Sequence, residues 1–205
     1  MFGKHKKLEF MAIGDTVVDA FIKLKKAEVS GEPDTPSYKI CLPFAEKVEY
    51  EDVFVIPAVG NSANAAISAA RLGLDTGIVT NLGDDRGGED CLAELKRNKV
   101  RTDFVKINKG KKTNYHYILW YGAERTILIK HQDYDYTMPD IDSPKWVYFS
   151  SVNETAFPFH YKIADYLEAH PKINLAFQPG KFEIKLGPEK LARFYKRAVL
   201  QKKLL

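Results

Sequence analysis

The feature that most constrains the fold is a run of small apolar residues between Gly60 and Gly73. Residues 62–72 are mostly Ala and Ile, and the run stops at a glycine, which commonly ends helices. Small side chains on all sides of a helix indicate close packing on a sheet. A strand over 77–80 and an amphipathic helix over 88–98 are predicted next. This strand–helix alternation favours a parallel α/β sheet.

The same alternation is predicted before and after this region. Short apolar runs predict strands, and longer periodic runs predict helices. The predicted strands are 8–13, 146–152 and 173–177, and the predicted helices are 158–169 and 188–199. Pro188 suits a first helical turn, because proline lacks only an amide hydrogen that this turn cannot use.

Two segments, 20–57 and 112–132, break the alternation with short β-prone stretches that are too closely spaced to enclose helices. They predict antiparallel strands, including a hairpin that turns at residues 122–124. If the two segments pair, they form a small lid at one end of the core. Ligands of such folds bind beyond the carboxyl ends of the parallel strands, where a lid excludes water.

Composition excludes several classes of protein. The apolar fraction of 45% is ordinary for a globular chain, and no apolar run reaches the roughly 18 residues that span a membrane. The net charge of +4 arises largely from lysines and arginines near the two ends, which does not indicate nucleic-acid binding. Cys41 and Cys91 stand alone, so we predict buried or half-buried thiols and no metal site. We expect a cytoplasmic protein without nucleic-acid or membrane partners.

Two segments contain candidate binding residues. Asp15 and Asp19 follow the first strand, where a carboxylate can accept hydrogen bonds from two hydroxyls of a polyol. A turn with a helix-capping Asp fits the same residues. In the stretch 60–64, Gly60 can bring the backbone close to a ligand, and the side chains of Asn61 and Asn64 add donors and acceptors. Simple capping by Asn61 or Ser62 is the alternative.

The ordered motifs resemble a known family. Gly60-Asn61-Ser62-Ala63-Asn64, Arg71-Leu72-Gly73, Asn81-Leu82-Gly83-Asp84-Asp85 and Gly122-Ala123-Glu124-Arg125-Thr126 are similar to motifs of the ribokinase-like (PfkB) carbohydrate and nucleoside kinases. The resemblance covers most of residues 8–180. It implies an α/β fold with a doubly wound, mostly parallel sheet and a small antiparallel β lid, which could also join two copies into a homodimer.

The resemblance also implies an activity and a site. Members phosphorylate a hydroxyl of a sugar or nucleoside with ATP and Mg²⁺. By this resemblance Asp19, Gly60 and Asn64 contact the acceptor, with Asn61 beside them. Members usually carry Gly where this chain has Val59, which cannot adopt a positive φ cheaply.

The lid and the strand ends supply further candidate contacts. Tyr117 and Arg125 lie on the predicted lid, and Gln178 follows a strand where the family often has Asp facing the phosphates. The aromatic run that includes Tyr117 could stack a nucleobase, but the apolar face of a lid is favoured. His116 and His131 fit packing roles better than ligand contacts.

One family motif is absent. No Gly-x-Gly-Asp follows Gly88, whereas the Asp of the Gly-Ala-Gly-Asp motif is the general base in the family. We therefore expect no catalytic residue in this chain, and we expect ATP and Mg²⁺ binding in a full-length member only. The hypothesis is an incomplete domain over 1–205, with its C-terminal part missing through truncation or a frameshift. The alternatives are a non-catalytic sugar- or nucleoside-binding module and an inactive fragment.

Overall fold

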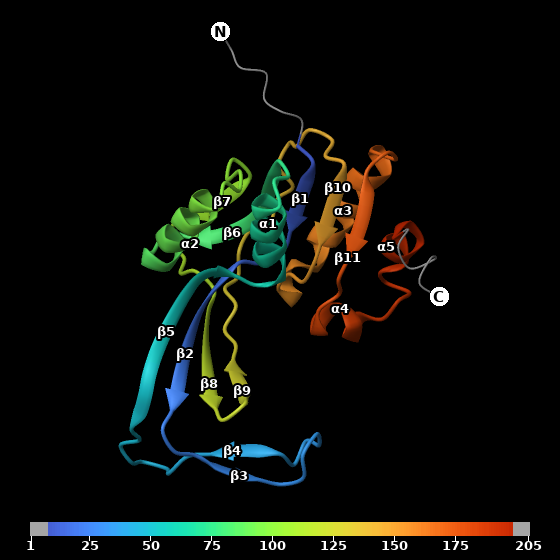
Figure 1. Cartoon of the computed structure of the whole chain (residues 1–205). Helices are drawn as coiled ribbons and strands as arrows, with labels where there is room; N and C mark the ends of the chain where they lie inside the picture. The colour runs from blue at the N-terminus through green and yellow to red at the C-terminus, as the bar shows by residue number, and fades with distance from the viewer. Residues whose placement is uncertain (1–7, 199–205) are drawn as a thin grey trace.

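A parallel sheet forms the centre of the molecule in a computed structural model that describes residues 8–198 (Figure 1). Its five strands run in the order β11-β10-β1-β6-β7. The strands are β1 (Phe10–Ile13), β6 (Thr76–Gly83), β7 (Val105–Asn108), β10 (Trp146–Phe149) and β11 (Asn174–Phe177). The predicted α/β class and parallel sheet are confirmed.

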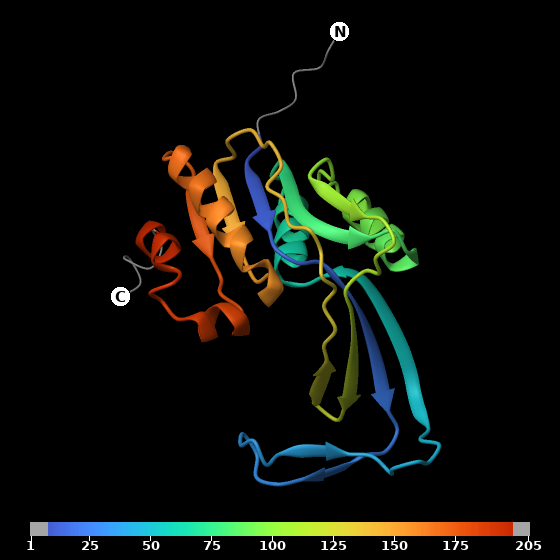
Figure 2. The ribbon, with the colours of Figure 1, turned by 180° about the vertical axis from the view of Figure 1, so that it is seen from behind.

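Helices cover both faces of this sheet, as the two opposite views show (Figures 1 and 2). They are α1 (Asn61–Arg71), α2 (Arg86–Arg97), α3 (Phe157–Ala169), α4 (Lys181–Leu186) and α5 (Ala192–Arg197), with a short 3₁₀ helix η1 (Glu154–Ala156) before α3. The face with α1 and α2 buries Ala66 and Cys91, whereas the face with α3 buries Phe149 and Ile163. The small residues of α1 pack against the sheet, as their size predicts.

The C-terminal region differs from the prediction. The helix expected over 188–199 is present but starts later, because residues 188–191 form turns and α5 begins only at Ala192. Gly187, with φ of +83°, ends α4, and the fully buried Leu191 anchors the start of α5. The elements β7 and α4 were not predicted, because they are too short for a clear periodicity. Val199 and the terminal lysines at 4, 6, 7, 202 and 203 lie outside the described residues.

A second sheet extends from the carboxyl end of β1 and forms the lid (Figure 1). Its strands are β2 (Val17–Leu24), β5 (Tyr50–Val59), β8 (Tyr115–Tyr121) and β9 (Glu124–Leu128), in the order β5-β2-β8-β9. Strand pairing is antiparallel in β2–β5 and β8–β9, but the two pairs join through parallel β2 and β8. A hairpin of β3 (Glu28–Ser30) and β4 (Lys39–Cys41) lies at the outer end.

Unusual backbone conformations lie where the lid leaves the core. Gly60 has φ of +101°, and a Cβ there would approach the carbonyl oxygen of Asp15 to 2.9 Å. Val59 avoids a positive φ, which falls instead on its neighbour Ala58, at +56°. The Ala58 amide donates to Sγ of Cys91 at 3.1 Å. Burial raises the pKa of Cys91 to about 12, so the thiol stays neutral and holds this junction.

Cys91 is buried and Cys41 is half-buried, as the sequence predicts. Across residues 8–198, none of the helices combines the length and the apolar character needed to cross a membrane.

Candidate functional site

Asp15 lies in the loop after β1 and is almost fully buried. Its Oδ1 accepts a hydrogen bond from the Tyr136 hydroxyl at 2.7 Å, and its Oδ2 accepts one from the Asn153 amide at 2.9 Å. Burial, the Asp15 charge and this hydrogen bond all raise the pKa of Tyr136, so the phenol remains a proton donor. The carboxylate of Asp15 therefore organises the loops at the strand ends.

The start of α1 is joined to the same loop. The Ser62 hydroxyl donates to the backbone oxygen of Asp15 at 2.9 Å, and Gly60 lies against that oxygen. Gly60 itself is the N-cap, so capping by Asn61 or Ser62 is wrong. Asn61 and Asn64 are exposed within the first turn of α1, and their side chains make no hydrogen bond within the described residues. Both amides are free to contact a ligand.

Asp19 lies inside β2, so the alternative in which it caps a helix is wrong. It stands opposite His116 in the parallel pair of β2 and β8. The Asp19 Oδ1 lies 3.3 Å from the His116 Nδ1 without the geometry of a hydrogen bond. Asp19 Oδ1 and His116 Nε2 are both buried atoms, and neither has a hydrogen-bond partner among residues 8–198. Unpaired buried polar atoms are rare and mark places where a ligand can supply the partner.

A second imidazole extends this cluster. The ring of His131 packs edge-on against His116, with centroids 5.3 Å apart, and its Nδ1 lies 3.6 Å from Oδ2 of Asp15. Asp15, His131, His116 and Asp19 thus form a row from the core loop to the lid. The packing role predicted for the two histidines is incomplete. The position of His116 beside Asp19 follows from the parallel pairing of β2 with β8, which periodicity does not reveal.

Asp85 has a structural role at the start of α2. It is the N-cap, accepting from the Gly88 amide at 3.0 Å and from the Thr113 hydroxyl at 2.6 Å. Burial alone would raise the pKa of Asp85, but hydrogen bonds from Thr113 and Gly88 outweigh it and lower the pKa. The bonds to Thr113 attach the second lid segment to α2.

The structure does not gather the remaining predicted contacts around Asp19. Tyr117 follows His116 on β8 and so points to the opposite face of the lid, where it lines a hollow of about 380 Å³. Arg125 lies at the tip of the hairpin, on another hollow of about 780 Å³. Gln178 follows β11 and accepts a hydrogen bond from the Tyr148 hydroxyl.

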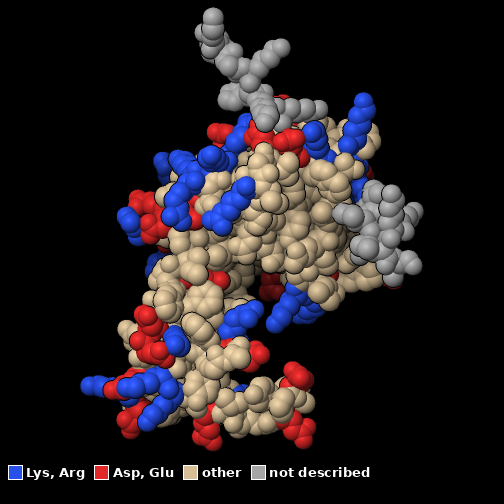
Figure 3. Space-filling view, in the orientation of Figure 1, with Lys and Arg blue, Asp and Glu red and all other residues tan. Residues whose placement is uncertain are grey.

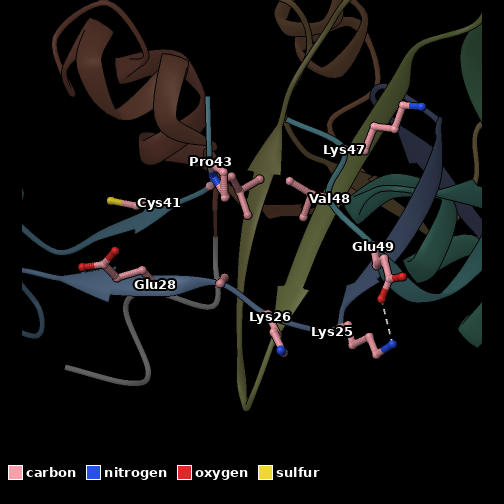
Figure 4. Close-up of a pocket in the computed structure, with 10 residues that line it drawn as sticks. Lys25, Lys26, Glu28, Cys41, Pro43, Lys47, Val48 and Glu49 are labelled. Carbon is pink, nitrogen blue, oxygen red and sulfur yellow. Dashed lines mark hydrogen bonds and ion pairs between the residues drawn. The ribbon is translucent and has the colours of Figure 1, made fainter. Parts of the chain in front are cut away.

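A further pocket of about 530 Å³ lies at the outer end of the lid (Figure 4). Pro43 and Val48 face each other across it, and Lys25 is paired with Glu49 at 2.8 Å (Figure 4). Asp19 lies near the opposite end of β2, so this pocket is separate from the row of carboxylates and imidazoles.

Residues 8–198 contain no group of three or more His, Cys, Asp or Glu side chains that could hold a metal ion. The Mg²⁺ that the family resemblance implies does not fit a cluster in this part of the chain. We therefore assign no step to a metal here.

Comparisons with solved structures support the fold. A ribokinase from Cryptococcus neoformans var. grubii, in complex with ADP, matches 91% of this chain with a TM-score of 0.65 and 21% identity. An Arabidopsis thaliana ribokinase complexed with ribose and ATP matches 84% with a TM-score of 0.66 and 16% identity. In each case the match covers 53% of the solved chain, so this chain spans about half of their length.

Sequence comparisons identify the family. Ribokinase of Bacillus subtilis is 35% identical over 79 residues, which are 38% of this chain and 27% of that protein. A 5-dehydro-2-deoxygluconokinase of Bacillus cereus is 47% identical over 49 residues, 24% of this chain and 15% of that protein. The model of the pfkB family carbohydrate kinases matches residues 27–168, more than half of the chain. The chain therefore belongs to the pfkB family of carbohydrate kinases.

Proposed function

We propose that these residues are the acceptor-binding part of an ATP-dependent kinase that phosphorylates a hydroxyl of a sugar or nucleoside. The observation that carries the proposal is Asp19, whose unpartnered carboxylate oxygen lies on the lid, close to where the lid leaves the core. Family membership and the fold shared with ribokinases that bind ribose, ATP and ADP support it.

The proposed roles follow from chemistry. A carboxylate accepts hydrogen bonds from hydroxyls strongly, so Asp19 holds the acceptor. Gly60 allows the backbone to come close, and the free amides of Asn61 and Asn64 add directional contacts. The lid excludes water from the acceptor. Tyr117, Arg125 and Gln178 lie apart from Asp19, so we assign them no contact with an acceptor held there.

Phosphoryl transfer needs groups that these residues do not supply. By the family resemblance, the general base is the Asp of a Gly-Ala-Gly-Asp motif, and no such sequence occurs in this chain. We therefore expect acceptor binding without turnover of ATP by the 205-residue chain.

Isothermal titration tests the proposed function. We expect ribose, fructose or adenosine to bind the purified chain, and we expect Mg-ATP to leave the affinity unchanged. Binding of ATP with formation of a phosphorylated product would show a complete kinase, whereas binding without nucleotide also fits a non-catalytic module. A folded chain that binds none of the three acceptors would contradict the proposal.

We also propose that the lid pairs two copies of the chain. Val53, Phe54, Val55 and Ile56 on the edge strand β5 are each 39–56% exposed, so both faces of the lid offer apolar surface. Such surfaces favour association, and most homo-oligomers are twofold dimers.

Sedimentation tests the lid dimer. Phe54→Lys is expected to convert a dimer into a monomer, because it places a charge on the apolar face. Glu51→Lys on the same strand serves as an exposed control and should remain dimeric. A monomeric wild-type chain at tens of micromolar would contradict this proposal.

A further inference from the structure

We infer that His116 is a specificity-determining residue, which reads one hydroxyl of the acceptor together with Asp19. The inference rests on the proposed function and extends it to a residue of the lid. Its basis is the pair of unpartnered atoms, Asp19 Oδ1 and His116 Nε2, on side chains that are neighbours across β2 and β8.

The direction of these side chains places the pair on the ligand side of the lid. Val18 and Tyr115, the preceding opposed pair, pack into the apolar cluster with Cys91 of α2. Because successive side chains of a strand alternate between faces, Asp19 and His116 point away from α2. On that side a hollow separates the lid from the core (Figure 3). The side chains of Asp19 and His116 keep 22% and 14% of their surface exposed, so they lie at the surface of the lid and not in the buried core.

Hydroxyl groups match this pair because each of them can donate a hydrogen bond to Asp19 Oδ1 or to His116 Nε2. Nδ1 lies toward Asp19, which leaves Nε2 as the ring nitrogen that can accept a hydrogen bond from the ligand when the ring proton is on Nδ1. One hydroxyl of a vicinal pair donates to Asp19 and the next donates to His116 Nε2. A group that only accepts hydrogen bonds satisfies neither atom. The cluster thus selects an acceptor by its adjacent hydroxyls, after small rotations of the two side chains.

Two further ionisable groups lie on the far side of the His116 imidazole. His131 faces His116 edge-on from the segment after β9, and Asp15 lies beyond it in the loop after β1. Asp15 is already held by Tyr136 and Asn153, which leaves Asp19 as the carboxylate that is free for the acceptor.

The experiment combines protein variants with altered ligands. Ribose, 2-deoxyribose and 3-deoxyribose are titrated into the wild-type chain, His116→Ala and His116→Gln. We expect His116→Ala to weaken ribose binding roughly tenfold, the usual worth of one hydrogen bond. For one deoxy sugar, the one without the hydroxyl that His116 contacts, the same variant should bind as the wild-type chain does. His170→Gln, at the C-terminal end of α3, is the matched control and should leave all three affinities unchanged.

Rescue by His116→Gln provides a second readout, which a loss of packing would not reproduce. His116→Gln keeps a side-chain oxygen that can accept a hydrogen bond, so it should retain more of the ribose affinity than His116→Ala does. If His116→Ala has wild-type thermal stability but loses affinity equally for all three sugars, or loses none, the role of His116 is overturned. The proposed function would then still stand. Failure of the wild-type chain to bind any acceptor, those of the first titration included, would overturn the proposed function as well.

Discussion

Replacing Asp19 with alanine is expected to reduce the affinity for the acceptor by about two to three orders of magnitude. Hydrogen bonds to a charged group contribute roughly 1.5–3 kcal/mol each, and a carboxylate can accept two from one polyol. Losing two bonds near the lower end of this range costs about 3–4 kcal/mol, and each 1.4 kcal/mol corresponds to about tenfold in the dissociation constant. Titration calorimetry with ribose and adenosine measures the loss directly. Asp19→Asn keeps the shape of the side chain but not its charge, so its affinity should lie between those of the wild-type chain and Asp19→Ala.

Asp52→Ala is the matched control for this experiment. Asp52 is an exposed carboxylate on β5 and lies on the same lid sheet as Asp19. Its removal should change affinity by less than about twofold, because surface charges away from the ligand contribute little. Wild-type affinity in folded Asp19→Ala would show that Asp19 has only a structural role. Thermal unfolding of each variant separates that outcome from a loss of the fold.

The core was predictable because its elements repeat a pattern that burial imposes. The small residues of α1 can cover a sheet closely, and Gly73, with φ of +93°, ends the helix as a glycine should. The strand β1 is buried on both faces, and β10 and β11 each bury apolar residues, so all three appear as short apolar runs. In each case the physical constraint acts within a window of a few residues, so one sequence is enough to reveal it.

The candidate site was less predictable, because it depends on contacts between distant segments. Nothing local indicates that Asp19 and His116 are opposed, since this requires the parallel pairing of β2 with β8. The burial of Asp15 depends on Tyr136 and Asn153, which are remote in sequence. The error at Pro188 has a local cause. A proline can begin a helix or sit in a turn, and the preceding Gly187 decides for the turn.

A second carboxylate, Glu183 in α4, connects the loops that follow β10 and β11. Its side chain is fully buried and accepts hydrogen bonds from the Ser151 hydroxyl at 3.0 Å and the Gly180 amide at 3.0 Å. The Val152 amide donates at 3.3 Å, and Nε2 of the buried His160 lies 3.3 Å away. The backbone oxygen of Ser151 accepts a hydrogen bond from the Asp15 amide, so this network is also connected to the candidate site.

Removing this carboxylate should destabilise the fold strongly. Glu183→Ala leaves four hydrogen-bonding groups without their common partner, two of which belong to the buried residues Val152 and His160, and truncating one member of a buried charged pair costs about 3–5 kcal/mol. Urea unfolding at pH 7 measures the change. Glu189→Ala, at an exposed position shortly after α4, is the control and should stay within about 0.5 kcal/mol of the wild-type chain. A loss below about 1 kcal/mol for Glu183→Ala would contradict the proposed network.

The same carboxylate predicts how stability depends on pH. Burial is the largest influence and works to raise the pKa of Glu183, but hydrogen bonds from His160 and backbone amides outweigh it and lower the pKa below the usual 4.5. The folded chain therefore binds this proton less readily than the unfolded chain. The stabilisation is present above pH 4.5 and is lost as the pH falls through the lowered value. The wild-type chain should thus lose stability relative to Glu183→Gln, which cannot titrate, as unfolding is followed from pH 6 to pH 3. A constant difference over that range would show that the carboxylate is not held in its charged form.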